Sequence, residues 1–171
     1  MPTPSVFITY TNRDGAGKQF AEHLKNALED SGYRDVYFFP HSSVESMGHM
    51  VWDTIAAEIE RRNVLLVVCT RAITLSRPAR REYNLAITLE KMVVPLQYDT
   101  VEVPLAIRPD IDVSFDETNF HEIFRIVAER LPGSYDDYAK EQAANEKALA
   151  DLQDVNEDTQ PAPRMGRDYS Q

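Results

Sequence analysis

Glu82 carries the carboxylate with the clearest capacity for chemistry. It follows an arginine-rich loop, residues 75–81, and stands at the opening of an expected helix. A helix amino terminus and adjacent arginines both favour the ionised form of a carboxyl group. Two interpretations are open: Glu82 balances charge in its first helical turn, or it is a fixed carboxylate that lines a ligand site.

Two polar segments are expected at the same edge of the fold as Glu82. Residues 11–14 follow a strand pattern at residues 6–10, and residues 41–48 follow another at residues 35–40. The carboxyl ends of parallel strands share one edge of a sheet, and ligands bind there in open α/β folds. We therefore expect both polar segments and Glu82 to line one site.

Other ligand and catalytic motifs are incomplete. Residues 14–18 read Asp-Gly-Ala-Gly-Lys and resemble a phosphate loop, but Asn12 replaces the first glycine and Gln19 replaces the Ser or Thr. The four histidines lack metal-ligand spacing, and there is no Gly-x-Ser-x-Gly elbow. Cys69 lies in an apolar run, so we interpret it as a core residue rather than a reactive thiol.

Strand and helix patterns alternate along the chain and predict the fold class. The expected strands are residues 6–10, 35–40, 64–69, 93–97 and 111–115. The expected helices are residues 16–30 (ending near Gly32), 51–59, the later part of 75–92, and 120–131. The continuous apolar run at residues 64–69 is typical of a strand covered on both faces. The prediction is an α/β fold: a doubly wound, flavodoxin-like parallel sheet with helices on both faces.

Charge and cysteine content narrow the function classes. The formal net charge of −10 argues against nucleic acid as the main partner. A single cysteine excludes an intrachain disulfide framework and fits a reducing compartment. No signal peptide and no run of membrane-spanning length are visible. We therefore expect a soluble, cytoplasmic protein without membrane contact.

The composition changes near residue 133. Residues 134–171 hold nine acidic and four basic side chains, so their net charge is −5. We expect a domain at residues 1–133 and an acidic tail at residues 134–171, helical over residues 135–152 and disordered from residue 154. The tail is either a solvated appendage or a helix for partner or self-association.

Three sequence blocks together resemble the Toll/interleukin-1 receptor (TIR) domain. Residues 7–14, Phe-Ile-Thr-Tyr-Thr-Asn-Arg-Asp, are similar to the family's opening F-I-S-Y-S-x-x-D. Residues 36–55 resemble its strand B, BB loop and helix B, and residues 76–82 resemble S-x-W-C-x-x-E in spacing. Pro78 and Ala79 stand in place of the Trp-Cys pair.

The resemblance implies an NAD⁺ nucleosidase or cyclase with Glu82 as its catalytic carboxylate. Enzymes of the family cleave the nicotinamide–ribose bond and release ADP-ribose or a cyclic or base-exchanged product. NAD⁺ is then the substrate, and no cofactor or metal is implied. The residues expected to contact NAD⁺ are Tyr10, Thr11, Arg13, Asp14, Ser42, Gly48, Ser76 and Arg80. Core packing for Tyr10 and solvated charge for the arginines are the structural alternatives.

The resemblance also implies partners and a setting. The BB loop, residues 41–48 here, packs under a second copy in this family, so we expect self-association linked to activity. Stand-alone TIR proteins of this kind resemble signal-making components of prokaryotic anti-phage systems such as Thoeris, in which the product activates a separate effector. The alternatives are a non-catalytic TIR adaptor or host-signalling mimic, which Pro78-Ala79 favours, and a receiver-like domain, which lacks its acidic pair and phosphoacceptor here.

Overall fold

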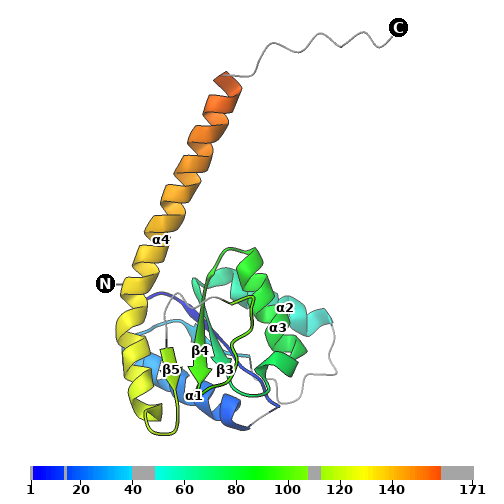
Figure 1. Ribbon diagram of the computed structural model, residues 1–171, viewed down its shortest axis with the longest axis vertical. Helices are drawn as coiled ribbons and strands as arrows, with labels where there is room; N and C mark the ends of the chain where they lie inside the picture. The colour runs from blue at the N-terminus through cyan, green and yellow to red at the C-terminus, as the bar shows by residue number, and fades with distance from the viewer. Residues whose placement is uncertain (1, 14, 40–48, 108–112, 159–171) are drawn as a thin grey trace. The chain divides into compact units, whose positions relative to one another are not determined.

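A five-stranded, all-parallel sheet forms the centre of the protein. The computed structural model describes residues 2–13, 15–39, 49–107 and 113–158 (Figure 1). The strand order is β2-β1-β3-β4-β5, and every neighbouring pair is parallel. The strands are β1 (Val6–Thr9), β2 (Val36–Tyr37), β3 (Val64–Cys69), β4 (Met92–Tyr98) and β5 (Val113–Phe115).

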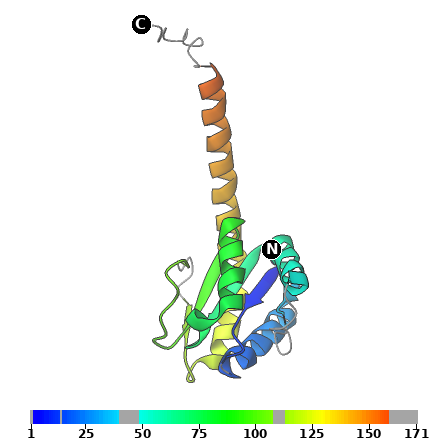
Figure 2. The same ribbon diagram turned by 90° about the vertical axis from the view of Figure 1, so that its right-hand side faces the viewer.

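Helices cover both faces of the sheet, which confirms the predicted doubly wound α/β fold. Helices α2 and α3 pack against each other on one face, which Figure 2 views from the front. On the other face, Phe20 of α1 stacks on Phe115 and contacts Phe124 near the start of α4. The helices are α1 (Gly15–Asp30), α2 (His49–Arg61), a short 3-10 helix η1 (Ile73–Leu75), α3 (Arg77–Thr88) and α4 (Phe120–Asp158).

The strongest sequence patterns gave the most accurate element boundaries. All six residues of β3 are buried, as its unbroken apolar run predicts for a central strand. Helix α1 ends in a Schellman turn, in which the Gly32 amide donates to the Glu29 carbonyl and the Tyr33 amide to the Leu28 carbonyl. Gly32 has a φ of +97°, which glycine adopts without strain and which explains the predicted helix stop.

The second strand is shorter than expected. A strand over residues 35–40 was predicted, but β2 contains only Val36 and Tyr37, which pair with Val6 and Phe7. β2 is an edge strand of the sheet and β1 is its one neighbour. Its length is therefore determined by the residues that pair with β1 alone. β5 likewise begins at Val113, and residues 111 and 112 lie outside the described part of the chain.

The last helix continues where the sequence predicts an end. A stop at residue 131 was expected before Pro132, but α4 runs on to Asp158 with Pro132 in its interior. Proline has no amide hydrogen and leaves the carbonyl four residues earlier, that of Ala128, without its helical donor. The Tyr33 hydroxyl donates to this carbonyl at 2.8 Å. A side chain from a distant part of the chain therefore replaces the missing helical hydrogen bond.

The chain divides into two compact units, Met1–Tyr135 and Asp136–Gln171. The first unit contains the sheet and its helices, and the second contains the later part of α4. Within the described residues, none of the helices is both long enough and apolar enough to cross a bilayer.

Candidate functional site

The carboxyl edge of the sheet has its topological switch point between β1 and β3. In the order β2-β1-β3-β4-β5, the chain leaves β1 toward one edge and returns through β3 toward the other. A crevice outside the carboxyl ends of these two strands is where ligands bind in such sheets. Tyr10 and Thr11 follow β1, while Thr70 and the segment leading to Glu82 follow β3.

Glu82 lies on the face of α3 that packs against the sheet. The buried residues of this helix are Ala79, Glu82, Tyr83 and Ala86, a spacing that defines a single helical face. The side chain of Glu82 is only 1% exposed. A carboxylate with so little access to water is expensive to bury, and such groups gather at functional sites more often than elsewhere.

The prediction that Glu82 stands in the first turn of its helix is wrong. α3 begins at Arg77 with Ser76 as its N-cap, so the first turn contains no acidic residue and Glu82 follows in the second turn. The field of the helix dipole falls off within the first turn. The helix terminus therefore contributes less to the ionisation of Glu82 than the sequence suggested.

Tyr37, at the end of β2, belongs to the electrostatic surroundings of Glu82. Burial raises the pKa of the half-buried Tyr37, and the charges of Glu58 and Glu82 raise it further, while Arg62 lowers it. The Arg62 guanidinium stacks on the Tyr37 ring with 4.6 Å between its central carbon and the ring centroid. Sequence reasoning assigned Tyr37 to a strand and missed this proximity, because nothing local in the chain connects β2 with α3.

Ser76 has a clear structural role. It is buried, and its hydroxyl oxygen accepts a hydrogen bond from the Ala79 amide at 3.3 Å, which caps α3. Pro78 stands in the first turn of the helix, where its fixed φ is favourable. Ala79 is fully buried in the core beneath α2 and α3. The predicted contact of Ser76 with NAD⁺ stays a prediction.

The arginines before Glu82 form an exposed basic segment. Arg71, Arg77, Arg80 and Arg81 are exposed, and no acidic residue lies between positions 70 and 81. Arg80 lowers the pKa of Tyr83, which burial raises, so its charge lies near that ring. Arg81 stacks over Trp52 at 4.0 Å from its ring centroid. Sequence reasoning had selected Arg80 but neither Arg71 nor Arg77.

The residues predicted after β1 differ in their exposure. Tyr10 is 1% exposed; its ring contacts Phe38 edge-on, and its hydroxyl donates to the Phe39 carbonyl at 2.9 Å. Stacking of Tyr10 on a substrate ring would therefore require displacement of a neighbour. Thr11 is buried and its hydroxyl oxygen accepts from the Arg13 amide at 3.2 Å, whereas the Arg13 side chain is exposed.

The remaining predicted contacts lie outside the described residues. They are Asp14, Ser42 and Gly48, together with the rest of the loop at residues 41–48. Across the described residues, no group of three or more His, Cys, Asp or Glu side chains is arranged to hold a metal ion.

Comparison with known proteins identifies the family. The family model described as TIR domain matches residues 6–124. Two crystal structures resemble the fold: the TIR domain of the Toll-related receptor TRR-2 from Hydra magnipapillata, and a prokaryotic SEFIR domain. The Hydra domain is 21% identical over 80% of this chain and 99% of its own, with a TM-score of 0.51. The SEFIR domain is 19% identical over 75% of this chain and 99% of its own, with a TM-score of 0.50.

No curated protein matches the chain. At these identities the structural likeness shows a shared fold, whereas the family model spans more than half of the sequence and includes Glu82. The chain therefore belongs to the TIR domain family.

Proposed function

We propose that this TIR domain cleaves the nicotinamide–ribose bond of NAD⁺, with Glu82 as the catalytic carboxylate. The observation that carries the proposal is the position of Glu82: its carboxylate is almost fully buried on the sheet-facing side of α3, beside the β1–β3 switch point. A buried carboxylate at this edge of the sheet is suited to stabilise a cationic transition state.

The chemistry requires little besides that charge. When the bond between nicotinamide and ribose breaks, positive charge develops on the sugar, and a preorganised carboxylate stabilises it. Nicotinamide departs as a neutral molecule, so no general acid is needed. Water as the acceptor gives ADP-ribose, and an adenine ring nitrogen gives a cyclic product.

The basic segment supports an anionic substrate. Arg77 and Arg81 are four residues apart and Arg80 lies between them, so like charges crowd one face at the start of α3. Positive charge is also unfavourable at a helix amino terminus. A bound pyrophosphate would relieve both repulsions and accept charge-assisted hydrogen bonds from Arg80. The exposed Arg13, after β1, would contact the same group.

The burial of Glu82 bears on regulation. Because the carboxylate is 1% exposed in a single chain, access for a dinucleotide requires rearrangement of its surroundings. We propose that self-association produces this rearrangement, that activity rises steeply with protein concentration, and that the product acts on a separate effector in prokaryotic immune defence.

The decisive experiment measures nicotinamide release by the full chain over a range of protein concentrations. Glu82→Gln keeps the shape of the side chain and removes its charge, and we expect the rate to fall at least about a hundredfold. Glu22→Gln, at an exposed position on α1, is the matched control and should retain the wild-type rate. Equal release by wild type and Glu82→Gln would remove Glu82 from the mechanism.

A second candidate function is a non-catalytic TIR interaction module. The chain segments after β3 and β4 expose Leu75 at 64% and Leu105 at 94%, and such side chains suit a partner surface. Release of nicotinamide by neither protein, at any concentration, would favour this module over the enzyme.

A further inference from the structure

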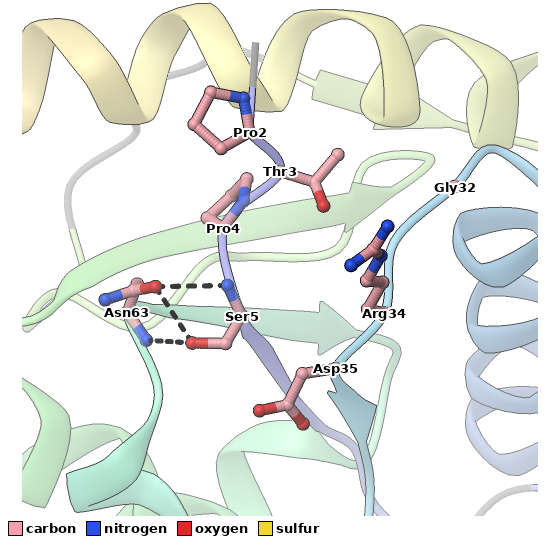
Figure 3. Close-up of a pocket in the computed structure, with 8 residues that line it drawn as sticks. All are labelled: Pro2, Thr3, Pro4, Ser5, Gly32, Arg34, Asp35 and Asn63. Carbon is pink, nitrogen blue, oxygen red and sulfur yellow. Dashed lines mark hydrogen bonds between the residues drawn. The ribbon is translucent and has the colours of Figure 1, made fainter.

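A pocket of about 520 Å³ opens at the amino ends of β1, β2 and β3, the opposite end of the sheet from Tyr10 and Thr70. Figure 3 shows its lining. The chain segment before β1, the turn before β2 and the residue before β3 surround it. The lining residues are Pro2, Thr3, Pro4, Ser5, Gly32, Arg34, Asp35 and Asn63. Its volume is in the range of small-molecule sites.

The floor of this pocket is rigidly held. The Asn63 side-chain oxygen accepts from the Ser5 backbone amide at 3.1 Å and from the Ser5 hydroxyl at 2.9 Å (Figure 3). The Asn63 backbone amide donates to the Ser5 hydroxyl oxygen at 3.0 Å. The Val6 amide also donates to the Asp35 carbonyl at 2.9 Å. These bonds fix the segment before β1 against both neighbouring strands, so the pocket is preformed.

Arg34 brings to the pocket a positive charge that has no counter-charge among the residues described. Asp35 contributes a carboxylate, but its Oδ1 contacts Nη2 of the buried Arg62 at 2.9 Å. Arg34 is exposed and forms no ion pair within the described part of the chain. Its guanidinium and the Thr3 hydroxyl point toward the same space in Figure 3. The Arg34 guanidinium and the Thr3 hydroxyl can therefore both donate hydrogen bonds to an anion in this space, while one oxygen of Asp35 is engaged by Arg62.

The remaining walls favour an organic ligand over a bare ion. Pro2 and Pro4 present apolar rings and have no amide hydrogen to offer. Gly32 has no side chain, and a Cβ built there would meet nothing within 4 Å, so that side is open. A phosphate ion would leave most of the volume and both proline rings uncovered.

We propose that this pocket binds a small organic anion, in which a phosphate or carboxylate group accepts hydrogen bonds from Arg34 and Thr3 and an apolar ring lies against the prolines. The site is separate from the one that contains Glu82, so the proposal does not depend on cleavage of NAD⁺. Phosphate monoesters and aromatic carboxylates share the required chemistry.

The test is a titration of the isotope-labelled full chain followed by amide NMR, with adenosine monophosphate as the principal probe. Benzoate, inorganic phosphate and adenosine are the other arms. We expect adenosine monophosphate to bind at least about tenfold more tightly than phosphate or adenosine alone, because both halves of the ligand then have contacts. The largest shifts should occur at Thr3, Gly32 and Asn63. Tighter binding of benzoate than of adenosine monophosphate would identify a carboxylate rather than a phosphate as the preferred group.

Three variants make the outcome decisive. Arg34→Gln should weaken binding about tenfold or more, and Thr3→Val by less, since charge-assisted hydrogen bonds exceed neutral ones. Arg130→Gln, at an exposed position on α4, is the matched control and should bind as wild type does. The proposal is overturned if none of the probes binds, if Arg34→Gln and Arg130→Gln bind equally well, or if the shifts appear at residues 77–82 instead.

Discussion

Removing the hydroxyl of Tyr33 isolates one hydrogen bond that allows α4 to continue through a proline. Tyr33 is 3% exposed and its hydroxyl donates at 2.8 Å to the carbonyl of Ala128, itself 7% exposed. Pro132 stands four residues after Ala128 and has no amide to donate. In Tyr33→Phe, the ring still fills its place, but the buried carbonyl loses its donor.

The expected cost follows from the burial of that carbonyl. A buried acceptor left without a donor costs about 1–3 kcal/mol, so we expect Tyr33→Phe to lower the free energy of unfolding by about 2 kcal/mol. Pro132→Ala restores an amide donor and a residue with high helix propensity, and should stabilise α4 by up to about 3 kcal/mol. In the Pro132→Ala background, the hydroxyl is no longer the only donor, and Tyr33→Phe should cost about 1 kcal/mol or less.

The assay is urea unfolding of wild type, both single variants and the double variant, followed by the fluorescence of the single tryptophan, Trp52. Tyr98→Phe is the matched control, because Tyr98 contacts the Phe115 ring but its hydroxyl has no hydrogen bond to any described residue. It should change the free energy of unfolding by no more than about 0.5 kcal/mol.

Two results would refute the reasoning. One is a cost for Tyr33→Phe that is the same with proline and with alanine at position 132, which would mean that the hydroxyl does not substitute for the missing amide. The other is a cost no larger than that of Tyr98→Phe, which would mean that the carbonyl finds another donor.

Two further predictions concern Cys69 and Ser76. Burial raises the pKa of the Cys69 thiol from 9.0 to about 12, so the unfolded chain loses this proton first. The contribution of the thiol to stability is fully present below pH 9.0 and falls by about 1.4 kcal/mol per pH unit up to about pH 12, as judged by comparing urea unfolding of wild type with that of Cys69→Val. A wild type that loses no more stability than Cys69→Val would contradict this. Ser76→Ala removes the N-cap of α3 and should destabilise the chain by about 1 kcal/mol in thermal unfolding, whereas Ser76→Thr keeps an acceptor and most of the stability. Equal destabilisation by the two substitutions would contradict the capping role of Ser76.

Local pattern was sufficient for the sheet and most of its helices. The apolar run of β3 predicted a strand buried on both faces, and the helix expected over residues 16–30 is α1, whose buried residues Phe20, Leu24 and Leu28 recur at helical spacing. Gly32 marked the end of that helix. These features depend on the chemistry of neighbouring residues, on the period of helix or strand and on the freedom of one glycine, so a single sequence was enough to identify them.

Non-local contacts decided the rest. Pro132 indicates a helix end when only its neighbours in the sequence are considered. The helix continues because the hydroxyl of Tyr33, which lies 95 residues before Ala128, donates to the Ala128 carbonyl. The proximity of Tyr37 to Glu82 and the pocket formed by Thr3, Arg34 and Asn63 likewise depend on which strands are neighbours. The sequence alone could name Glu82 as a candidate, but its burial is a property of the packed sheet and helix, because exposure is determined by what the rest of the chain places around a side chain.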